Sequence, residues 1–314
     1  MLSPIFPNFL RTIPRLNCLK IAASLFVTDW SKLDSTLKSA LLHLMHLPTT
    51  NHIDLSDILN FKLSGLTPSI NLHRLDMSDV RCSYLSAEDG SAEIGLSEMI
   101  PKIREFHTIG SDIITAMLLS AKMQDGRPAF DFIDLRRLSI PFKHLLDEQC
   151  IRYLLQNAKL LERLHLSVGK HESLMKLHDI FLSPIIRTLK VLDLTVPLYD
   201  DSFDPLLLAG LCEELEAMAG HDMLEALSFE VRVNRHWTVD LLGSTIQNVE
   251  KVLVKPGWSA LRRVSFKISI TLHGASREFI VEWSQVLQSL PDKYLSHLSK
   301  LESIAFNYST IFDY

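Results

Sequence analysis

Residues 161–166 read Leu-Glu-Arg-Leu-His-Leu, and residues 189–194 repeat the pattern as Leu-Lys-Val-Leu-Asp-Leu. Each stretch has an apolar residue, two variable residues, a second apolar residue, one variable residue and a third apolar residue. The last two apolar positions alternate with polar ones, which is the pattern of a β-strand with one buried face. The first apolar residue lies three positions before the second, as at the end of a preceding turn or helix. Both stretches therefore predict short strands whose apolar side chains enter a core.

The same string recurs along the whole chain. The middle apolar residue of each copy, its anchor, is Leu19, Ile53, Leu75, Phe106, Leu138, Leu164, Leu192, Leu227, Val264 and Ile304. Two copies are weaker, because Thr50 and Thr108 hold apolar positions, and the tenth copy consists of Leu301, Ile304 and Phe306. Anchors follow one another at intervals from 22 residues (Ile53 to Leu75) to 40 residues (Val264 to Ile304). Such recurrence predicts an irregular leucine-rich repeat.

Amphipathic helices are predicted between several strings. Apolar residues recur at helical spacing over residues 33–47, 146–158, 207–218 and 279–290. Pro48 and Pro291 are predicted to end the first and the last of these helices, and Gly220 to cap the third. The alternation predicts an α/β fold: an irregular leucine-rich-repeat solenoid, or horseshoe, formed by residues 1–314 as a single domain of about ten repeats. Its parallel sheet would line the concave face and its helices the convex face.

A doubly wound α/β sheet is the alternative fold. It also alternates strands with helices, but it normally carries glycine at the phosphate-binding turns after its strands. The chain has 11 glycines and contains neither G-x-G-x-x-G nor a P-loop sequence. The solenoid also accounts for the recurrence of the string itself, so it is the favoured prediction.

Composition argues against several functional classes. The net charge is −5, without the basic excess of general nucleic-acid binders. No stretch reaches the roughly 18 apolar residues of a membrane span, and the N-terminus does not resemble a signal peptide. The four isolated cysteines, Cys18, Cys82, Cys150 and Cys212, predict buried or half-buried free thiols in a reducing compartment. We therefore expect a protein of the cytoplasm or the nucleus that binds neither nucleic acid nor membrane.

Residues with catalytic or metal-binding chemistry do not form a motif. His43 and His46 lie three residues apart on a predicted helix, but no nearby Cys, Asp or Glu completes a metal site. The sequence contains no G-x-S-x-G, no H-E-x-x-H and no kinase signature. It therefore predicts a non-catalytic chain with no cofactor and no metal. Two alternatives stay open: a structural scaffold without a dedicated ligand, and a hydrolase whose site is assembled across repeats.

The polar residues of the strands are predicted to form a binding surface. Side chains between and after the apolar positions point away from the core, onto the concave face. The candidate partner-binding residues are Arg74, Asp76, Glu105, His107, Arg137, Arg163, His165, Asp193, Glu230 and Arg263, with His52, Asp54 and Lys267 beside them. We expect a protein partner whose acidic or mixed-charge segment binds the repeats from Glu105 to Asp193, because arginine binds carboxylates bidentately. Trp237, in the loop after the Leu227 strand, is a further candidate contact.

A family resemblance rests on residues 13–21 (Ile-Pro-Arg-Leu-Asn-Cys-Leu-Lys-Ile), the helix from Trp30 to Pro48, and the strings at 53–55 and 72–77. Their order resembles the F-box/leucine-rich-repeat-like proteins that are numerous in mushroom-forming fungi. The resemblance covers nearly the whole chain through degenerate motifs. It implies the substrate-recognition part of a Skp–cullin–F-box ubiquitin ligase. A Skp-type adaptor would bind through an F-box preceding Met1, since residues 1–314 show no such module.

Overall fold

A computed structural model of the protein describes residues 5–22, 27–81, 99–142, 145–168, 188–198, 212–213, 215–220, 223–234, 239–271 and 277–313. The chain divides into two compact units. Unit 1 comprises Met1–Pro141 and Leu145–Leu160, and unit 2 comprises Phe142–His144 and Leu161–Tyr314.

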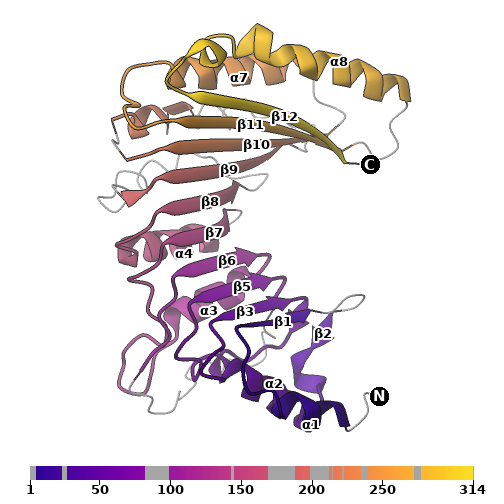
Figure 1. Ribbon diagram of the computed structural model, residues 1–314, viewed down its shortest axis with the longest axis vertical. Helices are drawn as coiled ribbons and strands as arrows, with labels where there is room; N and C mark the ends of the chain where they lie inside the picture. The colour runs from indigo at the N-terminus through magenta and orange to yellow at the C-terminus, as the bar shows by residue number, and fades with distance from the viewer. Residues whose placement is uncertain are drawn as a thin grey trace. The chain divides into compact units, whose positions relative to one another are not determined.

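The protein has a mixed α/β fold with a parallel sheet of ten strands, in the order β1-β3-β5-β6-β7-β8-β9-β10-β11-β12 (Figure 1). The strands of unit 1 are β1 (Cys18–Ala22), β3 (His52–Ser56), β5 (Arg74–Ser78), β6 (Glu105–Ile109) and β7 (Arg137–Phe142), of which only the last residue, Phe142, belongs to unit 2. The strands of unit 2 are β8 (Arg163–Val168), β9 (Val191–Leu198), β10 (Ala226–Asn234), β11 (Arg263–Thr271) and β12 (Ala305–Asp313). The α/β class and the parallel sheet predicted from the recurring string are thereby confirmed.

Unit 1 has helices α1 (Ile5–Arg11), α2 (Ser35–Met45), α3 (Asp112–Ser120) and α4 (Leu145–Asn157). Two short 3₁₀ helices, η1 (Trp30–Lys32) and η2 (Leu63–Gly65), and a small parallel sheet of β2 (Thr28–Asp29) and β4 (Ile58–Leu59) complete it. Helix α2 begins where the Asp34 carboxylate accepts hydrogen bonds from the backbone N–H groups of Thr36 and Leu37. It ends at Met45, ahead of Pro48, as the sequence predicts.

The anchors form the core of unit 1. Ile53, Leu55, Leu75 and Met77 are fully buried, and successive anchors are direct partners in the sheet register. In the weaker string at Ile53, Thr50 takes the first apolar position and is buried there. Its hydroxyl lies 2.8 Å from the carbonyl oxygen of Leu44 and so has a hydrogen-bond partner. A hydroxyl with such a partner occupies an apolar position without leaving an unpaired buried group.

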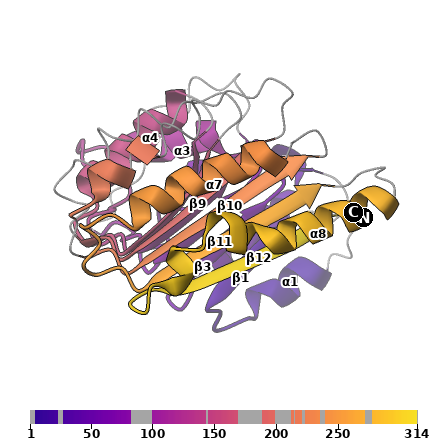
Figure 2. The same ribbon diagram turned by 90° about the horizontal axis from the view of Figure 1, so that it is seen from above.

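Unit 2 has longer elements, with helices α7 (Val239–Leu253) and α8 (Arg277–Tyr294) and the 3₁₀ helix η6 (Leu298–Lys300). The two α-helices run side by side (Figure 2). Leu164 and Leu192 are fully buried, as predicted. The Phe229 and Phe266 rings of neighbouring strands stack with their centroids 4.9 Å apart, so the apolar row continues across the sheet.

The tenth string lies in a different register from the one predicted. Val264 pairs with Phe306, so Phe306 rather than Ile304 is the tenth anchor. The backbone N–H of Ala305 donates to the Arg262 carbonyl at 2.7 Å, which fixes this register. Ile304 is still nearly buried, at 9% exposure, so both readings place an apolar residue in the core.

Pro291 does not end the last helix, contrary to the prediction. Helix α8 continues through it to Tyr294. Proline lacks the N–H that would bond the carbonyl four residues earlier, which belongs to Leu287. The Tyr308 hydroxyl of β12 donates to that carbonyl at 2.9 Å instead. Burial raises the pKa of Tyr308 above its ordinary value, so the hydroxyl keeps the proton that it donates.

The described cysteines differ in how deeply they are buried. Cys150 is buried and Cys212 is half-buried, as predicted, but Cys18 is exposed because it lies on the edge strand β1 with its side chain away from the core; Cys82 lies outside the described residues. The predicted 207–218 helix is described only at residues 212–213 and 215–218, and Gly220 after it has a positive φ of 101°. Within the described ranges, no helix is long and apolar enough to cross a membrane.

Candidate functional site

Each unit has an open face, defined as the side of its strands opposite the buried anchors. In β3, His52 and Asp54 are half-buried while Ile53 and Leu55 between and beside them are fully buried. The same alternation in the neighbouring strands defines the open face of unit 1. Its polar residues are Lys20, His52, Asp54, Arg74, Asp76, Glu105, His107, Arg137 and Ser139.

Glu105 joins two arginines across three strands of this face. Arg74, Glu105 and Arg137 are register partners in β5, β6 and β7. The Glu105 carboxylate lies 3.6 Å from Nη1 of Arg74 and 3.3 Å from Nη1 of Arg137. Arginines at equivalent strand positions would repel each other, and the acid between them compensates that repulsion. Because both arginines are exposed and Glu105 is only half-buried, the pairing is weak in free energy.

Asp76 is the most enclosed acid of the row. It accepts a hydrogen bond from Nη2 of Arg74 at 2.8 Å and lies 2.9 Å from Nε2 of His52. Burial alone would raise the pKa of Asp76, but the hydrogen bonds from Arg74 and His52 outweigh it and hold the pKa below its ordinary value. Lys20, on the edge strand, pairs with Asp54 at 2.7 Å. Each acid of this face therefore has at least one basic partner.

Asp76, His107 and Ser139 lie side by side in register, and these residue types could form a catalytic relay. The geometry does not connect them. Asp76 bonds Arg74 and His52, and within the described residues no hydrogen bond links His107 to Asp76 or to Ser139. The described contacts of Asp76 are therefore with Arg74 and His52 of the same face.

The open face of unit 2 has two separate groups of charges. In the first, Arg163 donates from Nε to the Asp193 carboxylate at 2.8 Å. Beside it, Nε2 of His165 lies 3.1 Å from the Thr195 hydroxyl.

Glu230 is the centre of the second group. It lies 3.0 Å from Nε of Arg232 and 3.3 Å from Nζ of Lys267. Burial opposes ionisation of Glu230, yet the bonds from Arg232 and Lys267 keep its pKa below the ordinary value. Arg263 differs from these residues, because its register partners are Ala226 and Ala305 and it has no acidic partner in the described part of the chain.

All ten candidate residues predicted from the sequence lie on strands and on the open faces. The structure joins eight of them in contacts: Arg74, Asp76, Glu105 and Arg137 in unit 1, and Arg163, His165, Asp193 and Glu230 in unit 2. It gives His107 and Arg263 no such contact within the described ranges. Trp237 lies outside the described residues.

Two participants were missed by the sequence reasoning. Lys20 lies between Leu19 and Ile21, so the rule that selected Asp54 would also have selected it. Arg232 lies two residues beyond Glu230, and it reaches the open face because β10 continues to Asn234. A recurring string only three apolar positions long does not reveal that extra strand length.

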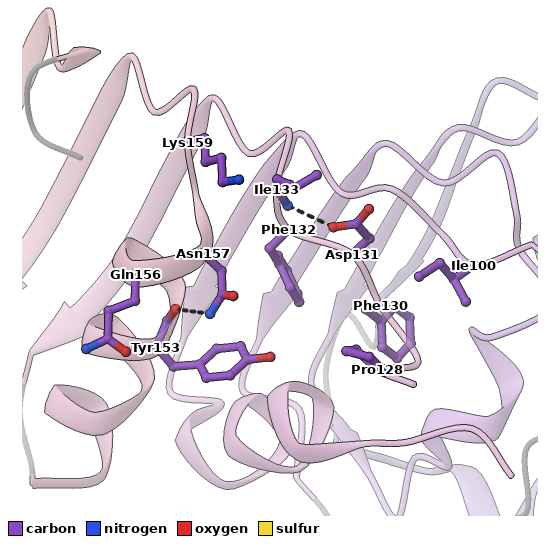
Figure 3. A pocket seen from close by; sticks show the side chains of 10 residues that line it. All are labelled: Ile100, Pro128, Phe130, Asp131, Phe132, Ile133, Tyr153, Gln156, Asn157 and Lys159. Atoms are coloured by element: carbon purple, nitrogen blue, oxygen red, sulfur yellow. Dashed lines mark hydrogen bonds between the residues drawn. The ribbon is translucent and has the colours of Figure 1, made fainter. Parts of the chain in front are cut away.

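A shallow pocket of about 350 Å³ lies in unit 1, between helix α4 and residues 128–133 (Figure 3). Phe130, Phe132 and Tyr153 give it an aromatic lining. Its polar groups are largely committed to the backbone, since Asn157 donates to the Tyr153 carbonyl at 2.7 Å and Asp131 accepts from the Ile133 N–H at 2.9 Å.

Histidines elsewhere have structural contacts. Nε2 of His46 lies 2.8 Å from the Gly65 carbonyl oxygen, so one imidazole of the His43–His46 pair contacts backbone. Across the described ranges, no three His, Cys, Asp or Glu side chains gather as a metal site requires.

The fold and the open faces define a parallel-sheet α/β protein with a row of paired charges on exposed strand positions. Comparison with protein-family models gives no match, and no curated protein has a significantly similar sequence.

Proposed function

We propose that this chain is an irregular leucine-rich-repeat solenoid, or horseshoe, that binds a protein partner without catalysing a reaction. The observation that carries the proposal is the open face itself. In strand after strand the apolar side chains are buried while the polar ones between them stay accessible. In a solenoid this is the concave face, which repeat proteins present as an extended binding platform.

The chemistry of the partner follows from the charges. Arg74 and Arg137 are 47% and 64% exposed at their side chains, although both contact Glu105. A partner carboxylate can replace that exposed contact with a bidentate one, and a partner lysine can reach Glu105 in return. A segment of mixed charge fits such a row best, and an acidic segment fits Arg163 and Arg263 of unit 2.

The resemblance to F-box/leucine-rich-repeat-like proteins extends this proposal to substrate recognition for a Skp–cullin–F-box ubiquitin ligase. The complete gene product should co-purify with a Skp-type adaptor, and removal of an F-box before Met1 should abolish the interaction. A complete product that binds no adaptor would leave only the general protein-binding function.

The binding face is tested by substitution and affinity capture. The double variant Arg137→Ala and Arg163→Ala should lose partners that the wild-type chain retains from a lysate of its own source. Arg127→Ala is the matched control, because Arg127 is an exposed arginine paired with Asp125 away from the strands. Retention of every partner by the double variant, or equal loss in the control, would contradict a site on the open faces.

A further inference from the structure

The last strand, β12, is an edge of the ten-stranded sheet, with β11 on one side. Its sequence is AFNYSTIFD over nine residues. Exposed edge strands are usually protected from pairing by lysine, proline, short length or a bulge. β12 has no lysine and no proline. The opposite edge strand, β1, has only five residues and carries Lys20 in its centre.

The backbone of β12 points outward at alternate residues. Ala305 donates its N–H to Arg262 of β11, and the parallel register continues to Asp313. The backbone groups of Phe306, Tyr308, Thr310 and Phe312 therefore point away from β11. Within the described residues these groups have no partner strand. Unpaired edge groups of this kind are a template for another strand.

Within the described residues, the side chains of β12 have a neighbouring strand on one side only. Val264, Phe266, Ile268 and Ile270 of β11 are all buried, at 2% exposure or less. Their register partners Phe306, Tyr308, Thr310 and Phe312 are only half-buried. On the open face, Ile311 is 42% exposed. A further strand beside β12 would place side chains next to those of β12 on each face of the sheet.

The sequence of β12 is complementary to itself in the antiparallel direction. A two-fold axis at Ser309 is the arrangement that pairs all nine residues with a second β12. It places Phe306 opposite Phe312 and Tyr308 opposite Thr310, and these are the residues whose backbone groups point outward. It also places Asn307 opposite Ile311 and Ser309 opposite Ser309, so no like charges meet across the pair.

We propose that β12 is a dimerisation strand, which pairs antiparallel with β12 of a second copy of this chain about a two-fold axis at Ser309. Phe306, Tyr308, Thr310 and Phe312 would each donate and accept one backbone hydrogen bond across the axis. The Phe306–Phe312 pairs would extend the aromatic row of the sheet, in which Phe266 and Phe306 already lie 6.3 Å apart. An isologous pair closes after two copies, so a dimer and not a fibre is expected.

The association is tested by sedimentation equilibrium of the purified chain and of charge variants. Ser309→Glu places two carboxylates at the axis, while within one copy it faces the cation Lys267. We expect about tenfold weaker dimerisation with unchanged folding. Ser309→Lys should also weaken it, and a mixture of the two variants should restore the dimer. Ser265→Glu, the same change on the interior strand β11, should have no effect.

The register is tested by cross-linking. Opposed residues of a non-hydrogen-bonded antiparallel pair have Cα atoms about 4.5 Å apart, within reach of a disulfide. Ser309→Cys should form a covalent dimer under mild oxidation, whereas Asn307→Cys alone should form no more than the wild type. A wild-type chain that is monomeric at all concentrations, that forms open polymers, or that pairs only with a foreign peptide would overturn the proposal. Equal cross-linking of both cysteine variants would overturn the axis.

Discussion

The recurring string forms short strands in unit 1 and longer strands in unit 2. Strands β1, β3, β5 and β6 have five residues each, whereas β10, β11 and β12 have nine. Helices change in parallel, from 11 residues in α2 to 15 in α7 and 18 in α8. A longer strand buries more apolar side chains and needs a longer helix to cover them.

The extra strand length serves both faces of unit 2. On the core side, β10 adds Val231 and Val233 and β11 adds Ile268 and Ile270 to the buried anchors. On the open side, the same extension brings Arg232 to Glu230. In the five-residue strand β5 of unit 1, Arg74 pairs with Asp76 two residues later, and Glu105 joins Arg74 and Arg137 from strand to strand. The longer strand therefore adds a second charged residue, Arg232, to the open face beside Glu230.

Anchor truncation should give the largest effect in both units. Leu192→Ala in unit 2 and Leu75→Ala in unit 1 each remove a fully buried side chain. We expect each to lower the free energy of unfolding by about 2–5 kcal/mol, because a cavity adds to the lost burial. Chemical denaturation measures it. Equal loss from the exposed Leu160→Ala would contradict the anchor role.

Loss of the buried carboxylate Glu250 in unit 2 should give the next largest effect. Glu250 of α7 is 3% exposed, and it accepts the backbone N–H groups of His297 at 2.7 Å and Leu298 at 3.0 Å. Glu250→Ala should cost about 1–3 kcal/mol, because the buried N–H of Leu298 and the part-buried N–H of His297 lose their acceptor. The exposed Glu302→Ala is the control. An unchanged denaturation midpoint for the Glu250 variant would show that water replaces the carboxylate.

The Tyr308 hydroxyl takes the place of the N–H that Pro291 lacks, and it should contribute less to the free energy of unfolding than Glu250 does. Tyr308→Phe removes the bond to the Leu287 carbonyl and should cost about 1 kcal/mol. In a Pro291→Ala background, the alanine N–H can bond that carbonyl again. The same Tyr308→Phe change should then cost clearly less. Equal costs in the two backgrounds would rule out this coupling.

The smallest effects should be those of the open faces, and they depend on pH. The pKa values of Asp76 and Glu230 are lowered in the folded chain, so their charges stabilise the fold above their unfolded pKa values of about 4. That stability is lost as the pH falls through the folded values. Asp76→Asn and Glu230→Gln should each cost about 1 kcal/mol or less at pH 7. The difference from wild type should disappear in thermal melts at acid pH, and a difference that grows there would contradict the sign.

The sequence predicts the strand positions well because a buried apolar residue recurs at each anchor. It fails where two alternative registers would bury the same face of a strand. The tenth register is the clearest case. Moving an anchor by two residues, from Ile304 to Phe306, keeps every side chain on its own face of a strand. The hydrophobic pattern therefore cannot separate the two readings, and the Ala305–Arg262 backbone bond decides between them.

Helix α8 shows a second limit. Proline predicts a helix end from local chemistry alone, but the Leu287 carbonyl is satisfied by Tyr308 from a distant strand. Candidate residues on the open faces were predictable for the same reason as the anchors, since alternation fixes which side chains are exposed. Their partners were predictable only where an acid and a base lie at the same or adjacent positions of one open face. Arg163, whose register partner Val191 lies two residues before Asp193, is such a case.

The position of Glu105 between two arginines has a consequence for how fast a partner can arrive. On the open face of unit 1, the cations Lys20, Arg74 and Arg137 are matched by Asp54, Asp76 and Glu105. Because these opposite charges lie so close together, their electric fields largely cancel at distances greater than a Debye length of about 8–10 Å. A partner should therefore associate with unit 1 without electrostatic steering, at about 10⁵–10⁶ M⁻¹s⁻¹ and nearly independently of ionic strength. Discrimination between partners would then begin at contact, where an incoming carboxylate must compete with Glu105 for its two guanidinium groups.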